Sequence, residues 1–461
     1  MTTGTDLVEV RAGLYHDSVS LMRVSQALIS RPGVDVAVVA MATELNVGLA
    51  REAGFEVPPA GPSDLLVAIR AESGQALGEA AEELRRQFAE LAGGARGGGG
   101  VAVESPPRTT RAAARAWDAT LALVSVPGDH AFAEAMDAVE AGLSVMIFSD
   151  NVPVEQEVLL KERAQERGVL VMGPDCGTAV VGGAGLGFAN VLRPGRVGVV
   201  AASGTGAQHV TCLLDHAGAG VSHVLGVGGR DLSAAVGGRS TLAALAALDA
   251  DPSTGLIVLI SKPPAPEVAE TVRRAIEGLS TPMVTALLGP GQDDLTAATE
   301  KALKALGLPV PAWPSWTVPQ EAGPGGLSGL YSGGTLCAEA RIVAGTGTFT
   351  DFGDDEYTRG RAHPMIDPAL RLEALARTGG VALLDVVLGH AADPDPSARL
   401  APAIREARER GTAVVVTLVG TDSDPQGLRR QADALVAAGA SVFTSNAAAA
   451  RHAAGLIGSA L

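Results

Sequence analysis

The stretch VGVVAASGTG, residues 197–206, decides the fold of this chain more than any other. Its first half is an apolar, β-branched run that predicts a buried strand, and its second half is a glycine turn that opens a helix over 207–214. A strand, a tight turn and a helix in this order begin a βαβ unit of a parallel, doubly wound sheet. A glycine-rich helix entrance also lets backbone N–H groups and the helix dipole approach an anion.

A second turn of the same kind, SGGT at 332–335, stands far along the chain before a helix expected over 336–343. Two such turns in one acidic chain predict a site that holds a phosphate or acyl phosphate from two sides. In the simpler alternative, each turn only caps its own helix. The phosphate-binding residues that the first interpretation predicts are Ser203, Gly204, Thr205, Gly206, Ser332, Gly333, Gly334 and Thr335.

Composition narrows the class of protein. The chain has 461 residues and a formal net charge of −16, which argues against nucleic-acid or anionic-membrane partners. No apolar run is long enough for a membrane helix, and the first residues lack the basic and apolar pattern of a signal peptide. Three cysteines without metal-ligand spacing predict reduced thiols and no metal site. We therefore expect a soluble, cytoplasmic protein.

Strand and helix patterns alternate along almost the whole chain, interrupted by two stretches rich in Gly and Pro. This pattern predicts a multidomain α/β fold with doubly wound parallel sheets, in which ligands lie beyond the carboxyl ends of the strands. The expected divisions are a small N-terminal α/β domain (1–93), a linker (94–118), an α/β domain (119–194), a second (195–308), another linker (309–326) and a last α/β domain (327–461).

The chain resembles the FdrA family, which is related to succinyl-CoA synthetase. The matching segments follow one another over nearly the whole chain: YHDSVSLM (15–22), GPDCGT (173–178), LGFAN (186–190), SGTG (203–206), GVGGRDL (226–232), ISKPP (260–264), GLYSGGTL (329–336), HPMID (363–367) and LLDVVLG (383–389). The resemblance implies that 119–194 is a Rossmann domain like the CoA-binding domain of the synthetase. It also implies that 195–308 and 327–461 are flavodoxin-like ligase domains.

In the related synthetases two helices point their N-termini at a phosphohistidine, and the two glycine turns fall on those helices. The stretch that corresponds to the phosphohistidine loop, 287–294, has no histidine, and the chain has no ATP-grasp domain. His209 stands where the synthetases, and also the FdrA family, lead us to expect a glutamate. ATP-driven ligation by this chain alone is therefore not expected.

The FdrA family is associated with oxamate carbamoyltransferase, which acts with further subunits. The resemblance thus implies a transferase subunit that interconverts oxalurate and phosphate with oxamate and carbamoyl phosphate. Such a subunit would bind phosphate, carbamoyl phosphate or a small carboxylate, would need no cofactor, and would assemble into an oligomer with partner subunits. Desolvation and backbone donors at the turns suit this chemistry.

Three residues are candidates for catalytic roles. Arg230 follows a GVGG turn and could bind a carboxylate with two hydrogen bonds, or form a structural salt bridge. Lys262 precedes two prolines and could bind phosphate or a substrate carboxylate, or simply extend to solvent. His209, one turn into the first helix, could accept a proton or a phosphate, or pack inside the protein.

The predicted substrate-binding set lies on loops that follow strands. Cys176 could be a nucleophile, although a packed thiol is the simpler interpretation, and His363 could bind substrate or hold a loop. The acidic stretch 351–356 is interpreted as a solvated loop, with metal binding as the alternative. The complete set is Asp175, Cys176, Gly177, Asn190, Asp231 and His363.

Two further functions remain open from the sequence. The chain could be a CoA-dependent acyl transferase or ligase of the NDP-forming acyl-CoA synthetase superfamily, which would bind CoA in its CoA-binding-like domain. It could also be a non-catalytic scaffold that keeps an ancestral shape.

Overall fold

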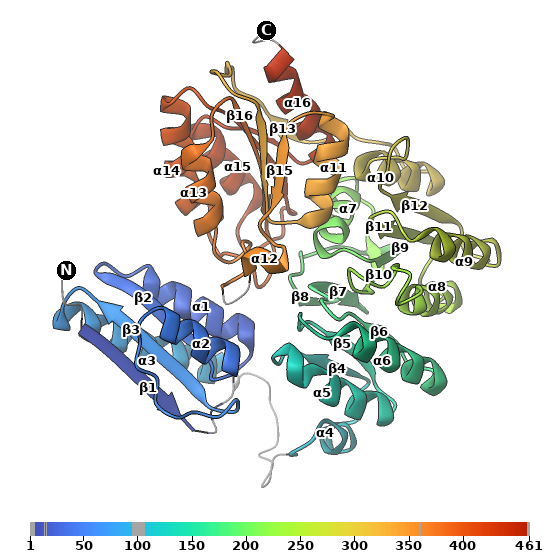
Figure 1. The fold of residues 1–461 in the computed structure, drawn as a ribbon. Coiled ribbons are helices and arrows are strands. Elements are labelled where there is room, and N and C mark those ends of the chain that lie inside the picture. The colour runs from blue at the N-terminus through green and yellow to red at the C-terminus, as the bar shows by residue number, and fades with distance from the viewer. Residues whose placement is uncertain (1–4, 13, 15, 95–106, 359–360, 459–461) are drawn as a thin grey trace. The chain divides into compact units, whose positions relative to one another are not determined.

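The computed structural model describes residues 5–12, 14, 16–94, 107–358 and 361–458. The chain divides into two compact units, a smaller one that holds the first three strands and a larger one that holds the other fifteen described strands (Figure 1). Tyr15 of the first matching segment, and residues 95–106 of the expected linker, lie outside the described residues.

The smaller unit is a three-stranded antiparallel sheet with helices on both faces. Its elements are β1 (Thr5–Arg11), α1 (Ser18–Ile29), β2 (Val34–Met41), α2 (Glu44–Glu52), β3 (Leu65–Ala71) and α3 (Gly74–Gly94). The central strand β3 pairs with β1 on one side and β2 on the other. Helices α1 and α3 pack on one face and α2 on the other, which explains why β3 is almost entirely buried.

The larger unit begins with a short three-stranded parallel sheet. It contains α4 (Thr110–Trp117), β4 (Leu121–Val124), α5 (Gly128–Glu140), β5 (Ser144–Ile147), α6 (Val154–Arg167) and β6 (Val171–Met172), with the strand order β4-β5-β6. Helix α4 lies in the last part of the segment 94–118, which the sequence indicated as a linker.

A six-stranded sheet of order β12-β11-β9-β10-β7-β8 follows. Its elements are β7 (Thr178–Val181), β8 (Ala184–Gly187), β9 (Pro194–Ala201), α7 (Gly204–His216), β10 (Val221–Gly226), α8 (Arg239–Ala250), β11 (Leu256–Ser261), α9 (Pro266–Glu277), β12 (Met283–Leu287) and α10 (Leu295–Ala305). The strands from β9 to β12 are parallel, and the hairpin β7–β8 adds an antiparallel edge. Residues 197–201 are buried as expected, because helices cover both faces of the sheet.

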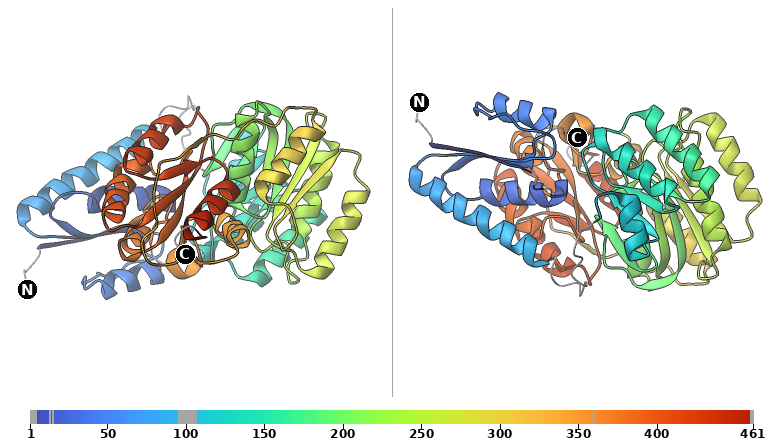
Figure 2. Two further views of the ribbon diagram at one scale, coloured as in Figure 1. Left: turned by 90° about the horizontal axis from the view of Figure 1, so that it is seen from above. Right: turned by 90° about the horizontal axis from the view of Figure 1, so that it is seen from below.

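A second six-stranded sheet has the order β13-β18-β17-β16-β14-β15. Its elements are β13 (Ser315–Trp316), β14 (Leu327–Tyr331), α11 (Gly334–Ala344), β15 (Thr348–Asp351), α12 (Asp355–Thr358), α13 (Ala369–Arg377), β16 (Val381–Val387), α14 (Pro396–Glu409), β17 (Ala413–Val419), α15 (Leu428–Ala437), β18 (Ser441–Phe443) and α16 (Asn446–Gly458). All neighbours are parallel except β13, which comes from the expected second linker. Helices stand on both sides of this sheet (Figure 2).

The two large sheets share a layer of helices. Helices α7 and α10 of the first sheet contact α11 and α16 of the second, so that the two glycine-turn helices lie beside each other (Figure 1). The expected α/β fold with doubly wound parallel sheets and a small N-terminal domain is thereby confirmed. Both sheets follow the flavodoxin-like order, in which the first βα turn lies at the point where the strand order reverses.

Candidate functional site

Helix α7 begins inside the first glycine turn, at the carboxyl end of β9. Ser203 is the N-cap, and its Oγ accepts a hydrogen bond of 3.0 Å from the backbone N–H of Gly206. The capping role that the sequence left open is therefore present. The cap uses the backbone N–H of Gly206, whereas the O–H of Ser203 can still donate, so an anion at this turn would interact with that hydroxyl and with the other free donors of the helix entrance.

The buried carboxylate of Asp385 holds the second turn in position. Ser332 donates from its backbone N–H and its Oγ to Oδ1 of Asp385, at 2.8 and 2.9 Å. Asp385 is fully buried on β16 and pairs with Arg371, whose Nε donates to the carbonyl oxygen of Leu330. The hydroxyl of Ser332 is thus used in positioning the turn, and α11 begins at Gly334.

The two turns converge in space. A Cβ placed on Gly333 would lie 2.4 Å from Thr205 Oγ1, and a Cβ on Gly206 would lie 3.1 Å from Thr335 Cγ2. The backbone of each turn therefore packs against the threonine of the other. Because both helices start at this junction, the partial positive charges of their N-termini add in the same place.

Lys262 joins this junction from the end of β11. A Cβ on Gly334 would lie 3.1 Å from Lys262 Nζ and 2.4 Å from Asp351 Oδ2. The lysine is exposed, and it lies close enough to lower the pKa of Asp175 and Asp351 through its charge. The structure thus brings Lys262 together with both turns, while Asp351 comes from the end of β15.

His363 lies near the same junction. Its ring stacks on Phe188 with a centroid distance of 5.6 Å, and Nδ1 accepts a hydrogen bond from the backbone N–H of Met365. Its Nε2 would lie 2.8 Å from a Cβ on Gly353, which follows Asp351 by two residues. Burial lowers the pKa of His363 to about 4, so its ring is neutral near pH 7.

His209 does not reach the junction surface. It is 1% exposed on α7, and its Nε2 accepts the backbone N–H of Asn446 at 3.1 Å in the helix layer between the two sheets. Burial lowers its pKa to about 4. The role as acceptor of a proton or a phosphate that the sequence suggested is therefore corrected to an interior contact between α7 and the start of α16.

Asp231 is also an interior residue. Its carboxylate is fully buried and accepts hydrogen bonds from the first turn of α8, at Ser240 and Thr241, and from Lys161 Nζ. Both of its oxygens are occupied, so the predicted substrate contact is corrected to a structural one.

Arg230 forms the salt bridge that the sequence left as the simpler interpretation. Its Nη2 lies 2.9 Å from Oε2 of the buried Glu157 and donates to the carbonyl oxygen of Val152. About half of its side chain is exposed, with 48% of its area accessible. The guanidinium is thus partly committed to a structural role, and its catalytic role stays a prediction.

The remaining substrate-binding candidates divide into two groups. Cys176 is buried, its pKa is raised to about 12 by burial, and Asn190 binds the carbonyl oxygen of Leu388 and the carboxylate of Asp424, so both are corrected to structural residues. Gly177 lies beside the first turn, because its Cα would be 4.0 Å from a Cβ on Gly204. The surrounding protein, with the carboxylates of two other aspartates, raises the pKa of Asp175 to about 7.

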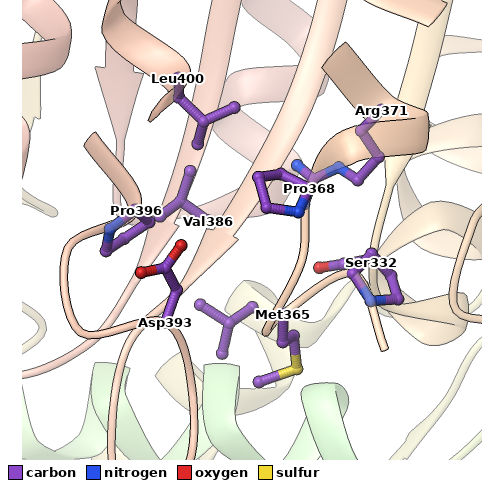
Figure 3. A pocket seen from close by; sticks show the side chains of 10 residues that line it. Ser332, Met365, Pro368, Arg371, Val386, Asp393, Pro396 and Leu400 are labelled. Atoms are coloured by element: carbon purple, nitrogen blue, oxygen red, sulfur yellow. The ribbon is translucent and has the colours of Figure 1, made fainter. Parts of the chain in front are cut away.

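A small pocket is lined by Ser332 of the second turn together with residues from the end of β16 and from the segments that follow β15 and β16 (Figure 3). Its lining is largely apolar, and its carboxylate, Asp393, is paired with Arg399. The guanidinium in the lining, that of Arg371, is paired with Asp385, so the lining residues offer an anion no unpaired cation. Its lining includes Ser332, Met365, Pro368, Arg371, Val386 and Leu400.

Reasoning from the sequence missed Asp351, Asp385 and Asn446. Asp351 and Asp385 each stand at or near the carboxyl end of a strand of the sheet that carries the second turn, which was the available signal. The sequence around Asn446 contained no such signal, because the importance of this residue comes from five hydrogen bonds to residues far away in the sequence.

Comparison with known proteins agrees with this architecture. Residues 330–456 match the family described as CoA-ligase, and residues 2–105 match the family described as AllF, heavy metal-associated domain. The uncharacterized protein YahF of Escherichia coli (strain K12) is 35% identical over 95% of this chain and 96% of its own length.

More distant relatives are CoA ligases. The α subunit 2 of an ADP-forming succinate–CoA ligase from Archaeoglobus fulgidus is 30% identical to this chain. The aligned segment covers 37% of this chain and 61% of that subunit. The solved structure of ATP citrate lyase from Methanothrix soehngenii with citrate and coenzyme A has a TM-score of 0.35 at 18% identity, over 44% of this chain and 38% of that chain. At this score the likeness adds nothing to the assignment. The sequence relatives favour the acyl-CoA synthetase superfamily over carbamoyl transfer.

The residues of the small N-terminal unit do not fit a heavy metal. Residues 1–108 contain no cysteine and one histidine, His16, whose ring stacks on Phe88 at 5.0 Å. In the described part of the chain no group of His, Cys, Asp and Glu could hold a metal ion. Soft metals take thiolate or thioether ligands; this unit supplies no thiolate, and of its described methionines Met41 is buried in the core, which leaves Met22 as a single thioether.

No helix within the described residues has both the length and the apolar character needed to cross a bilayer.

Proposed function

The chain belongs to the FdrA family of succinyl-CoA synthetase-like proteins, and from this premise we propose that it binds phosphate or an acyl phosphate at the junction of its two glycine turns. The observation that supports this proposal is the contact between Thr205 and Gly333, which joins two helix N-termini beside Lys262. Backbone N–H groups and helix dipoles would bind the phosphoryl oxygens, and the ammonium group would balance their charge.

In the finer form of the proposal, the acyl phosphate is carbamoyl phosphate. A phosphate oxygen attacks the carbamoyl carbon of oxalurate, the C–N bond to oxamate breaks, and the oxamate nitrogen takes up a proton. Phosphate held by preorganised donors is oriented for this attack, and the same donors stabilise the negative charge that develops. Further subunits would supply the oxamate site.

The lack of a histidine relay supports direct transfer. The loop after β12 lies next to the Lys262 loop, because a Cβ on Gly289 would be 3.9 Å from Pro263 Cγ. This loop, 287–294, contains no histidine, although it corresponds to the phosphohistidine loop of the related synthetases. An acyl phosphate that forms and reacts without leaving the junction needs no such relay.

A second candidate function is CoA-dependent acyl transfer or ligation. The match of residues 330–456 to the CoA-ligase family and the CoA-ligase relatives favour it. In this form, CoA would bind at the three-stranded sheet β4–β6, and an acyl phosphate at the junction would react with its thiol.

Calorimetric titration of the full chain separates these functions. Phosphate, carbamoyl phosphate, acetyl phosphate and CoA are added in turn to the wild type, to Lys262→Met, and to Lys304→Met as a control that removes an exposed lysine from α10. We expect binding of phosphate and carbamoyl phosphate that Lys262→Met weakens about tenfold or more and Lys304→Met leaves unchanged. Binding of CoA without carbamoyl phosphate would establish the second function. Binding of none of the four would leave the scaffold interpretation.

A further inference from the structure

We propose that the Asp351 carboxylate is the resident anion of the paired turns, which an external anion must displace or find protonated in order to bind. The carboxylate lies where the N-terminus of α11 and Lys262 meet, and this is the position that an incoming phosphoryl oxygen would share. The inference rests on the proposed function, since it describes which group occupies the same junction when no ligand is bound there.

The geometry places one oxygen of Asp351 over the helix entrance. Oδ2 would lie 2.4 Å from a Cβ on Gly334, the first residue of α11, and Lys262 Nζ would lie 3.1 Å from the same point. Any side chain at residue 334 would have to displace both groups. Glycine at this position is therefore what allows a carboxylate and an ammonium group to approach the helix entrance together.

The other oxygen holds the loop. Oδ1 accepts a hydrogen bond of 2.9 Å from the backbone N–H of Gly353. Asp351 ends β15, and its backbone is in parallel register with Tyr331, the residue immediately before the Ser332 turn. Strand pairing thus fixes the distance between this carboxylate and the turn, so its position does not depend on the mobility of an exposed side chain.

A carboxylate at this place does what a bound anion would do. It interacts favourably with the partial positive charge of the helix entrance and with the lysine. An external anion gains the same interactions only if it takes the place of Asp351, or if the carboxyl group is neutral. Two negative groups at one helix entrance would repel each other.

The charged and titratable groups around Asp351 come from several elements. Lys262 comes from the end of β11, His363 from the loop after α12, Asp385 from β16, Cys337 from α11 and Asp354 from its own loop. The thiol of Cys337 has a pKa raised to about 12 by burial, so it remains uncharged. The His363 ring remains neutral above about pH 4.

Burial raises the pKa of Asp351 to about 6, and the charge of Lys262 acts against this rise. Its carboxyl group therefore takes up a proton when the pH falls through about 6, and the junction then carries one negative charge less. Asp175 also interacts with Lys262 and has a pKa near 7, so it adds a component of the same sign at slightly higher pH.

The test uses sulfate, which keeps its charge between about pH 5 and about pH 8 and so does not titrate itself. Sulfate is titrated into the full chain by calorimetry across this range, for wild type, Asp351→Asn, Asp175→Asn and Glu356→Gln. Asparagine keeps the oxygen that accepts from Gly353, so the loop remains supported. Glu356→Gln is the matched control, because it removes one negative charge from the exposed helix α12 of the same loop.

We expect wild-type affinity for sulfate to rise as the pH falls. Near pH 8, Asp351→Asn should bind sulfate about tenfold more tightly than wild type, which corresponds to a coupling free energy of about 1.4 kcal/mol between the carboxylate and the bound anion. The pH dependence of Asp351→Asn should be flatter, with only the Asp175 component left. Glu356→Gln should follow the wild type. Sulfate binding by Asp351→Asn but not by wild type at high pH would also support the proposal.

Two results would overturn it. If wild type binds sulfate and Asp351→Asn binds it equally well with the same pH profile, Asp351 is not the resident anion, although the junction still binds anions. If neither protein binds sulfate at any pH, the proposed function fails together with this inference.

Discussion

The side chain of Thr205 packs directly on the backbone of Gly333, so that a Cβ on residue 333 would lie 2.4 Å from Thr205 Oγ1, 2.7 Å from its Cβ and 2.8 Å from its Cγ2. A Cβ atom does not approach heavy atoms to which it is not bonded this closely. The contact joins the first turns of α7 and α11, and through them it connects the two six-stranded sheets of the larger unit.

The first prediction concerns this contact. Gly333 has an ordinary φ of −121°, so Gly333→Ala would introduce a steric clash without backbone strain. We expect a loss of about 1–3 kcal/mol of stability, as for other overpacked interiors. Urea unfolding of Gly333→Ala against Gly326→Ala, an exposed glycine with nothing within 4 Å of its Cβ position, measures it. Adding Thr205→Gly to Gly333→Ala removes the side chain that clashes, so the double variant should regain most of the lost stability. Equal stability of Gly333→Ala and Gly326→Ala would refute the contact.

The second prediction concerns the pH dependence of stability through His209. Its folded pKa is about 4, below the usual 6.5, because the ring is buried. The unfolded chain therefore binds a proton that the folded chain does not between about pH 6.5 and pH 4, and stability falls as the pH falls through this window. The loss from this group reaches about 3 kcal/mol.

His209→Gln should remove this component. Glu339 and His363 also titrate with shifted pKa values, and Glu339, raised to about 7 by burial, acts in the opposite direction. The measurement is thus the difference between the stability curves of variant and wild type, with His130→Gln, at an exposed site on α5, as control. A difference that is constant from pH 7 to pH 4 would contradict the interior position of a neutral His209.

The third prediction concerns Asn446, whose side chain links α11 to the strands β14 and β17. Its side chain accepts from Tyr331 and Thr417, and it donates to Glu339 and to the carbonyl oxygen of Leu336. Asn446→Ala would leave several buried polar groups without partners, at about 1–3 kcal/mol for each. We expect a much larger fall in the thermal midpoint than for Thr417→Val, which removes one of these bonds. Similar midpoints for the two variants would show that the network contributes little.

The fourth prediction concerns metal binding by the N-terminal unit. Because this unit has no cysteine, and because the three cysteines of the chain are buried in the larger unit, we expect no stoichiometric binding of copper(I) or zinc. Metal content after dialysis of the full chain against each metal, compared with His16→Ala, measures it. One equivalent of metal that is retained by wild type and lost in His16→Ala would contradict the prediction.

The fold could be predicted because its signals are local. Runs such as LIVLIS in β11 and AVVVTLV in β17 are apolar on both faces, which is typical of strands covered by helices on both sides. The glycine turns follow β9 and β14 at the points where the strand order reverses in each sheet. The sequence contained no comparable signal for the antiparallel hairpin β7–β8, because its short strands are supported by pairing with β10.

The candidate site could be predicted only in part. Glycine turns and Lys262 carry their chemistry in their residue types, whereas the burial of His209, Asp231 and Asn190 comes from partners far along the chain. Conversely, Asp351 looked like part of a solvated acidic loop until strand pairing placed it beside the second turn.

Local residue patterns were enough to establish the class of fold, the two helix entrances and the kinship with the synthetases, since each depends on neighbours within a few residues. The packing of α7 on α11 determined whether the two entrances form one site, which side chains are withdrawn into the interior, and which carboxylate faces Lys262. The reason is physical: burial and the electrostatic field at a charged group depend on distances between atoms, and residues distant in the sequence set those distances.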